Sequence, residues 1–481
     1  MIESPQRSRR NPLKEVWATG AGRAGVILSA FLALVAIYVL ATFPADFGPT
    51  RWSNPAIWAD NPANAAPVWT QWFTSTDHAP HIVLEPGPGK IEEGETGVDI
   101  ATFSMPFTFH ADEPPAFLSI SVGDVVFVDR PPSVAVSLHR PDGAEVPLYR
   151  HVVPGARQGE TSPYSRYGEQ PLRVVLGPEP QTIEGARLLL EEEYGVTVAT
   201  SRIQGRTEEV LFGTLRPDGQ LVVLSGDYQL EVRATLHSPG DTVGSVGAVV
   251  GGTLFGVMGT DSLGRDLFQG LLFGLPVALL IGLLVSTLST GIGASLGLIS
   301  GYRGGKTDTL IQRAADVVTN IPVLPLLIFL VLIIGSKLWV ILLVLVAFSW
   351  PGLTIVVRSM VLQIRDGAEV EAAKALGASS TRIIYRHVFP HLAPFILAQL
   401  IFFAPSAILA EASLSFLGLG DPSIPTWGQI LEDGFRTGAV FLGYWWWVVP
   451  PGLAIVVTAL AFMLLALGTE PAVSPRLRRT V

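Results

Sequence analysis

The sequence has no cysteine among its 481 residues, so disulfides and thiol nucleophiles are excluded. Charged residues are also scarce: they make up 15% of the chain, against about 25% in an average soluble protein. This shortage indicates a membrane protein. The chain has no GxxxxGK[ST] phosphate loop, no HExxH zinc motif and no nucleophile–base pair. It therefore cannot drive itself by that route of ATP hydrolysis, and no cofactor or metal is indicated.

The charge is divided unevenly along the chain. Residues 44–250 hold about twice as many acidic as basic side chains, whereas the remainder is net basic. Two differently composed parts are therefore expected. The overall charge of −9 says little about partners, and nucleic acid is not suggested.

The N-terminal part contains a predicted membrane anchor. Residues 1–23 form a basic tail, and residues 24–45 are uncharged. This run is long enough to span a bilayer, which takes about 20 residues. The alternative is a cleaved signal peptide, but its apolar core would be shorter, about 7–15 residues. The basic flank places the N-terminus in the cytoplasm.

Residues 46–250 are rich in proline, glycine and turn signals, and they predict a mostly β extracytoplasmic domain. One helix is expected at Glu184–Tyr194. The expected strands are Phe117–Val122, Val125–Val128, Val134–Leu138, Leu172–Leu176, Leu221–Leu224 and Tyr228–Leu236. Four tryptophans form either an interfacial belt or contacts within the domain: Trp52, Trp58, Trp69 and Trp72. The histidines show no metal-ligand spacing.

A hydrophobic core at 255–470 follows. Its five predicted spans are about 270–300, 317–336, 338–357, 392–412 and 445–468. Pro322 and Pro325 should kink the second of these runs. Thr426–Phe435 could be a short surface helix on the outer side. The aromatic residues 444–447 fit an interfacial girdle better than a substrate cage.

A polar island at 366–390 separates two of these apolar runs. Asp366 and Glu369 indicate a capped helix start, and Gly377 is placed to end that helix in a left-handed turn. Ser379 or Ser380 can cap a second short helix that runs to about Val388, and Pro390 then opens the next apolar run. His387 and His391 are four residues apart, but Pro390 between them is expected to break the helix, so we interpret both as solvated or interfacial.

The island resembles the EAA motif of ABC-importer permeases through Glu371-Ala372-Ala373, Gly377 and Phe389-Pro390. His387 and Phe389 depart mildly from that motif, which usually ends in isoleucine-x-leucine-proline. Two further blocks resemble the dipeptide, oligopeptide and nickel permeases, C-type subunit: GTDSLGRD at 259–266, and EASLSFLGLG with PSIPTWG from Glu411 onward. The three blocks occur in the family's order, and the resemblance covers about residues 255–480.

The resemblance implies an all-α polytopic membrane protein. It would have six transmembrane helices, the core of a type I ABC importer permease, with the β domain inserted between helices 1 and 2. The loop 366–390 would be cytoplasmic and couple to an ATPase through Glu371, Ala372, Ala373, Lys374, Gly377 and Pro390. A structural motif at the outer membrane surface would comprise Asp261, Gly264, Arg265 and Asp266, acting as a cap and a local ion pair.

The implied protein is a transporter subunit of a bacterial or archaeal cytoplasmic membrane, and not an enzyme. Its implied partners are a second permease subunit, two ABC ATPase subunits, an extracytoplasmic solute-binding protein and membrane lipid. The basic tail at 471–481 places the C-terminus in the cytoplasm beside the N-terminus. The solute would be a dipeptide, an oligopeptide, nickel or another small solute.

Two other classes remain open. A membrane-anchored extracytoplasmic binding or sensor protein would use residues 46–250 as its functional part, and a channel would use the apolar helices. Both leave the island at 366–390 without a purpose.

Overall fold

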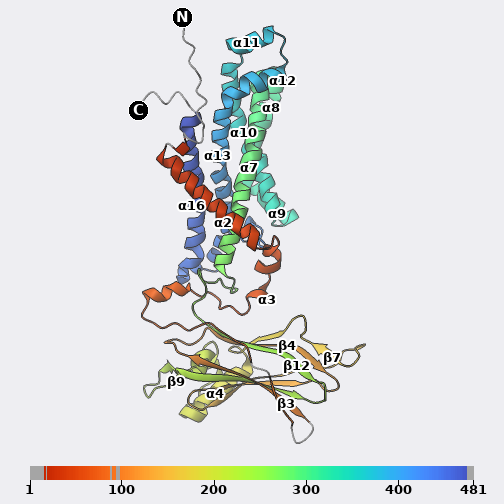
Figure 1. Ribbon diagram of the computed structural model, residues 1–481, viewed down its shortest axis with the longest axis vertical. Coiled ribbons are helices and arrows are strands. Elements are labelled where there is room, and N and C mark those ends of the chain that lie inside the picture. The colour runs from red at the N-terminus through yellow and green to blue at the C-terminus, as the bar shows by residue number, and fades with distance from the viewer. Residues whose placement is uncertain (1–15, 18, 87–88, 94–97, 474–481) are drawn as a thin grey trace. The chain divides into compact units, whose positions relative to one another are not determined.

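The computed structural model describes residues 16–17, 19–86, 89–93 and 98–473. Most of the predicted tails at 1–23 and 471–481 therefore lies outside the described residues. The chain divides into two compact units, a helical unit of Met1–Asn54 with Gln269–Val481 and a β unit of Pro55–Phe268 (Figure 1). The β unit thus extends past the predicted domain boundary at residue 250.

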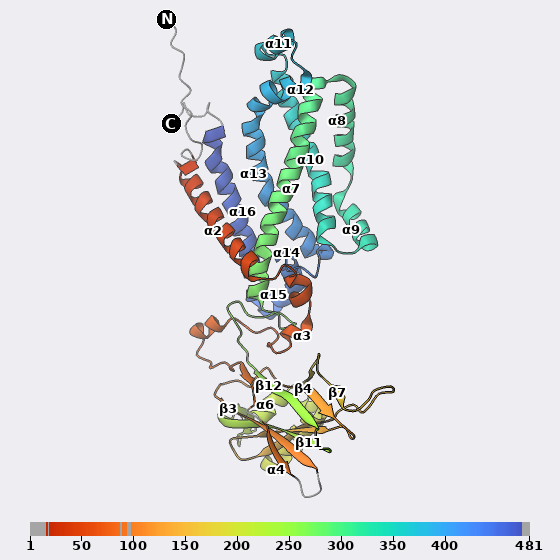
Figure 2. The ribbon, with the colours of Figure 1, turned by 45° about the vertical axis from the view of Figure 1, so that its right-hand side comes forward.

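Long apolar helices build the helical unit. They are α2 (Gly20–Thr42), α7 (Leu267–Arg303), α8 (Gly305–Asn320), α9 (Val323–Ile334), α10 (Leu338–Ile364), α13 (Phe389–Leu414) and α16 (Trp445–Val473). The shorter elements are η1 (Gly48–Trp52), α11 (Ala368–Ala375), α12 (Ser380–Ile383), η3 (Ile384–Val388), η4 (Ser415–Leu419), α14 (Trp427–Arg436) and α15 (Ala439–Leu442). Figures 1 and 2 show α11 and α12 at one end of this bundle, and Figure 2 shows α14 and α15 near the other.

Among the described residues, 5 helices are long and apolar enough to cross a membrane. The predicted span 317–336 is not one straight helix, because α8 and α9 meet at an angle of 75°. The break falls at Pro322, as expected, whereas Pro325 lies in the first turn of α9, where proline is tolerated. The count of 6 predicted spans is reached only if this bent pair forms one span.

Helices α7 and α10 approach each other closely through glycines. Gly293, Gly297 and Gly301 recur every fourth residue along α7, which places them on one face of the helix. A Cβ atom at Gly297 would lie 2.7 Å from the Val357 Cβ and 2.8 Å from the Thr354 carbonyl oxygen. Only glycine fits this contact, which resembles the small-residue packing common between membrane helices.

A polar network fastens the same helices near the end that carries α11. The Arg358 guanidinium of α10 donates two hydrogen bonds of 2.5 Å to the Asp308 carboxylate of α8. The Ser300 hydroxyl of α7 donates to the same carboxylate at 2.5 Å. Because this carboxylate receives bonds from two neighbouring helices, three helix ends are joined at one point.

Helix α14 corrects one expectation. Thr426 does cap it by accepting a hydrogen bond from the Gln429 N–H, as the predicted start at Thr426 requires. It is not a surface helix, however, because Trp427 and Ile430 are buried and the Trp427 Nε1–H donates to the Leu271 carbonyl at 2.9 Å. The apolar side chains at positions 427 and 430 lie on one face, which packs inward.

The β unit confirms the predicted mostly β domain. Two antiparallel five-stranded sheets share one apolar core with the helix α4 (Pro180–Tyr194). One sheet contains β1 (Ile82–Leu84), β12 (Thr242–Gly251), β4 (Phe117–Phe127), β7 (Tyr164–Arg166) and β8 (Leu172–Val175). The other has the order β2 (Lys90–Glu93), β3 (Asp99–Phe109), β11 (Gly226–Leu236), β5 (Ser133–His139) and β6 (Glu145–Val152).

The small elements of this unit are the ribbon of β9 (Gly213–Leu215) and β10 (Leu221–Val223), and the short helices α3 (Pro55–Trp58), η2 (Val68–Phe73), α5 (Thr200–Ile203) and α6 (Thr207–Leu211). The four tryptophans do not form one belt. Trp52 is buried in the helical unit and Trp58 in the β unit, whereas Trp72 is 83% exposed.

Helix α4 closes the outer edge of strand β6. The Gln181 side chain accepts from the Arg150 N–H at 2.7 Å and donates to the Arg150 carbonyl at 3.2 Å. The Thr182 hydroxyl donates to the Leu148 carbonyl at 2.8 Å. These side chains take the place of a neighbouring strand, so this edge is not open to pairing with another chain.

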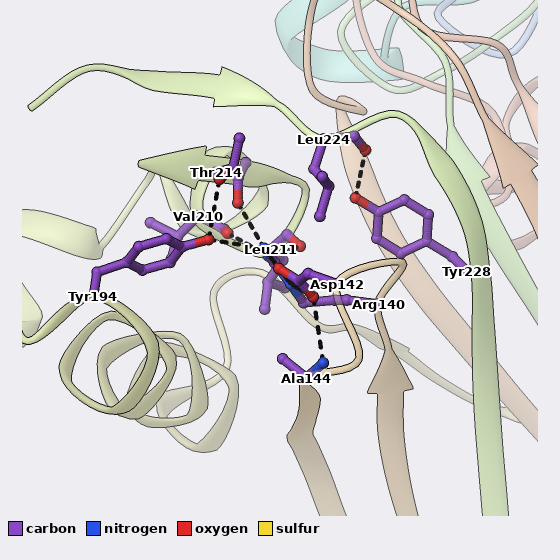
Figure 3. Close-up of polar contacts among 10 residues, drawn as sticks. Arg140, Asp142, Ala144, Tyr194, Val210, Leu211, Thr214, Leu224 and Tyr228 are labelled. Atoms are coloured by element: carbon purple, nitrogen blue, oxygen red, sulfur yellow. Dashed lines mark hydrogen bonds and ion pairs between the residues drawn. The ribbon is translucent and has the colours of Figure 1, made fainter. Parts of the chain in front are cut away.

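A buried arginine joins the β5–β6 turn to the short helix α6 and strand β9 (Figure 3). Arg140 is 4% exposed, and its guanidinium donates to the carbonyls of Val210, Leu211 and Gly213. The charge is balanced by Asp142, 2.7 Å away. Because every contact lies within the unit, we interpret this cluster as structural.

We predict that Gly297→Ala destabilises the helical unit by on the order of 1–3 kcal/mol, because the added methyl group overpacks the α7–α10 contact. Gly291→Ala is the matched control, since a Cβ atom there meets nothing within 4 Å. The control should be neutral or slightly stabilising, because alanine favours helix over glycine by about 1 kcal/mol. Thermal unfolding of the full chain in detergent measures both. Equal midpoints for the two variants would contradict the close contact.

Candidate functional site

The polar island folds as helix, turn and helix. Helix α11 ends in a Schellman turn, in which the Gly377 N–H donates to the Lys374 carbonyl at 2.9 Å and the Ala378 N–H to the Ala373 carbonyl at 3.1 Å. Gly377 has a φ of +75°, the left-handed conformation that glycine adopts without a steric penalty. The chain therefore reverses within three residues.

The two helix starts differ in how they are capped. Ser379 caps the second helix by accepting from the Arg382 N–H at 3.4 Å. The predicted cap of the first helix is wrong. Gly367 occupies that position without a side-chain bond, and Asp366 instead forms an ion pair of 3.3 Å with Arg365. The start of α11 therefore lies next to the Arg365–Asp366 ion pair, and no carboxylate caps its backbone N–H groups.

Helix α11 has one buried and one exposed side. Val370 is 1% exposed and Ala373 is 7% exposed. Both belong to an apolar cluster with residues of α7, α10, η3 and α13, among them Leu298, Val357, Val361, Ile384, Val388 and Leu392. Glu371 and Ala372 are exposed instead. The two neighbouring alanines therefore differ in their surroundings: Ala372 is exposed, whereas Ala373 packs in the apolar cluster.

Lys374 holds α11 against the bundle. Its ammonium donates to the Arg365 carbonyl at 3.4 Å and lies 5.8 Å from the centre of the Tyr302 ring. The Arg365 guanidinium in turn donates to the Gly301 carbonyl at 3.2 Å. Lys374 thus connects the island to the end of α7.

A groove of about 480 Å³ opens on the island. Its lining combines small, apolar and basic residues: Glu369, Ala372, Ala373, Leu376, Gly377, Ala378, Arg382, Arg386 and His387. Leu376 was not singled out by the sequence, yet it is 88% exposed at the end of α11. The sequence feature that could have drawn attention to Leu376 is its place directly before Gly377, the glycine that ends the helix.

Pro390 does not break the helix as expected. It lies in the first turn of α13, where its missing N–H costs little, and η3 runs directly into α13. His387 and His391 consequently remain on one continuous helical segment and both contact Glu369, at 3.0 and 3.2 Å.

The second predicted group of residues belongs to the β unit and lies directly before the start of α7. Asp261 is fully buried, forms an ion pair with Arg265 and accepts from the Leu263 N–H at 2.9 Å. Burial raises the pKa of Asp261, although Arg265 acts in the opposite direction. Gly264 has a φ of +74°, and Asp266 accepts from the Phe268 N–H at 2.9 Å.

Sequence reasoning assigned no role to two buried carboxylates. Glu411 lies within α13, is 3% exposed and accepts from the Ser415 hydroxyl at 2.7 Å. Asp421 is 7% exposed and accepts from the N–H of Leu338, the first residue of α10, at 3.4 Å. Each of the two carboxylates could have been noticed in the sequence as an isolated acidic residue beside an uncharged run.

We predict that Ala372→Cys reacts with a water-soluble maleimide at least about tenfold faster than Ala373→Cys, because burial slows access to the thiol. The wild-type chain has no cysteine, so each variant carries a single reactive thiol. The labelling rate is measured on the full chain in detergent. Equal rates at the two positions would contradict the orientation of α11.

Comparison with known proteins identifies the family. Residues 293–479 match the binding-protein-dependent transport system inner membrane component. The dipeptide transport system permease protein DppC of Bacillus subtilis is 36% identical over 46% of this chain and 69% of its own length. The oligopeptide transport system permease protein OppC of Bacillus subtilis is 34% identical over 46% of this chain and 72% of its own. The glutathione transport system permease protein GsiD of Pectobacterium atrosepticum is 35% identical over 46% and 73%.

A solved structure of the MetNI methionine ABC transporter is 19% identical over 42% of this chain and 94% of that one, with a TM-score of 0.35. The chain belongs to the inner membrane components of binding-protein-dependent transport systems, as a multi-pass permease subunit of the peptide-importer type and not an enzyme.

Proposed function

We propose that this chain forms half of the translocation path of an ATP-driven peptide importer and receives its driving force through α11. The observation that carries the proposal is the division of α11 into an anchored side and an exposed end. Val370 and Ala373 lie within the apolar cluster of the bundle, while Leu376 exposes 88% of its surface.

An exposed leucine at such a position favours a protein partner. Burial of a large apolar side chain contributes about 1.5–3 kcal/mol, and the small side chains of Ala372, Gly377 and Ala378 leave room for a groove beside it. Arg382 and Arg386 line the same groove, so an acidic rim on the partner would complement it. A separate ATPase subunit is the partner that the importer family requires.

The proposed orientation places α11 in the cytoplasm. The start of α2 and the end of α16 lie in the half of the bundle nearer α11 (Figure 2), which supports a common side for the two termini and α11. The basic residues of α8, α11 and α12 then face the cytoplasm, in agreement with the positive-inside rule. The β unit would lie on the outer side, between the first two spans.

The remaining partners follow from the same proposal. They are a second permease subunit, a second ATPase subunit, a solute-binding protein outside the membrane, and lipid. The relatives are named for dipeptide, oligopeptide and glutathione transport. We therefore propose peptides of a few residues as the solute. The alternative of a membrane-anchored sensor is not favoured by the family and leaves α11 without a partner.

We predict that Leu376→Asp and Glu371→Lys each weaken retention of the ATPase by at least about tenfold, because both change the exposed side of α11 at the centre of the proposed contact. Co-purification from detergent-solubilised membranes measures the retention. Neither change should reduce the amount of permease in the membrane fraction, because neither side chain is buried.

Glu192→Lys is the matched control for the charge reversal, since Glu192 is exposed on α4 of the β unit. It should retain the ATPase as the wild type does. A wild-type chain that brings down no ATPase in several detergents would contradict the proposed function. If both variants retain the ATPase as the wild type does, the ATPase binds elsewhere on this chain and not at α11.

A further inference from the structure

One carboxylate on α11 lies between two imidazoles of the segment that follows. His387 Nδ1 lies 3.0 Å from Glu369 Oε1, and His391 Nε2 lies 3.2 Å from Glu369 Oε2. Each carboxylate oxygen thus has its own imidazole partner. These contacts cross the turn at Gly377 and join the start of α11 to the start of α13.

The helical register makes this arrangement possible. His387 is in the π-helical turn η3, whereas His391 lies in the first turn of α13, four residues later. Residues four apart share a face of a helix, and the uninterrupted path through Pro390 keeps them together. A π-helical turn changes the direction of side chains relative to a regular helix and is common at functional positions.

The other charged groups around Glu369 are accounted for. Arg382 and Arg386 of the second helix line the same groove, while Glu371 is exposed on α11. Lys374 bonds to the Arg365 carbonyl, and Arg365 pairs with Asp366. The two histidines are therefore the groups that contact Glu369 directly among the described residues.

Val370 and Ala373 anchor one side of α11 in the apolar cluster of the bundle. On its other side, Glu369 and His387 both line the groove of about 480 Å³ between α11 and the following helix. A polar bridge across the rim of that groove limits how far α11 can swing. Because Glu369 belongs to α11 and His391 to α13, these contacts connect the two helices directly.

We propose that Glu369, His387 and His391 form a pH-sensitive clasp that positions α11 against α13. The role of this clasp in transmitting ATPase movement rests on the proposed function, whereas its existence does not. Glu369, His387 and His391 are positioning residues, since none is expected to contact ATP or the solute.

The direction of the pH dependence follows from the charges. The hydrogen bonds from His387 and His391 hold the pKa of Glu369 below its usual value. A carboxyl group with a lowered pKa keeps its stabilising contact above its ordinary pKa and loses it only as the pH falls through the lowered value. Glu369 therefore stays ionised at neutral and mildly acidic pH.

The strength of the contact then depends on the hydrogen-bonding groups and the charge that the two imidazoles present to Glu369. A neutral imidazole donates from only one nitrogen, whereas an imidazolium donates from both and carries a charge. Histidines gain this charge as the pH falls from about 8 to about 5. The clasp should consequently be tighter near pH 6 than near pH 8.

The test is a distance measurement on the full chain. Spin labels are attached at Ala375→Cys on α11 and Leu397→Cys on α13, both of which are exposed, in a chain that has no other cysteine. Pulsed electron resonance gives the distribution of label distances at several pH values from about 6 to about 8. The background is the wild type, Glu369→Gln, or His387→Gln with His391→Gln.

In the wild type, the distribution should narrow as the pH falls, with about a twofold rise in the population of the closed distance, as expected for an exposed ion pair. Both substituted backgrounds should show a broad distribution that does not change with pH. His110→Gln, at an exposed position in the β unit, should respond as the wild type does.

A wild-type distribution that is the same at every pH, or a pH response that persists without the two histidines, would overturn the proposal. This measurement needs no ATPase, so it fails or succeeds separately from the docking experiment. If the clasp is present and no ATPase binds, the proposed function alone is wrong.

Discussion

The central physical constraint is that α11 has no stable position of its own and shares an apolar cluster with the bundle. A helix of 8 residues is too short to persist in water without tertiary contacts. Val370 and Ala373 supply those contacts by packing with Val357 and Val361 of α10. Any force on the exposed end of α11 is therefore applied to a helix whose other side is part of the apolar core of the helical unit.

The close contact of α7 and α10 extends this connection into the bundle. Glycines every fourth residue bring the two helices together, and the Asp308–Arg358 ion pair fastens α8 to the same end. Val357 and Val361 face the α7 glycines and also belong to the cluster that holds α11. Helices α11, α7 and α10 are consequently one packed body, and α11 is not a loop loosely attached to a bundle.

Much of the island could be predicted from its residues because its structure depends on local chemistry. The left-handed turn at Gly377 and the cap at Ser379 are properties of those residue types in that order. The failures were contacts that no local pattern specifies. Pro390 was expected to end a helix, but in the first turn of α13 a proline is harmless. Leu376 is exposed because of how α11 packs, which the sequence alone does not state.

The β unit shows the same limit. Strands β5 and β11 were predicted because they are rich in valine and leucine. Strand β3 was missed since it contains Pro106, and β12 since it contains two internal glycines, Gly244 and Gly247. Both are long strands whose pairing with β11 and β4 overrides their weak local preference. Likewise, the predicted span 317–336 covers only the end of α8 before it continues into α9, and the residues predicted a kink at Pro322 but not a bend of 75°.

The proposed function requires an ATPase to contact this chain at the exposed end of α11. The most direct measurement places a photo-reactive amino acid at position 376 in living cells and identifies the crosslinked protein by mass spectrometry. The account predicts an adduct with a protein that contains a GxxxxGK[ST] phosphate loop, and none from position 263, an exposed leucine of the β unit. An ATPase adduct from position 263 but not from position 376 would contradict it.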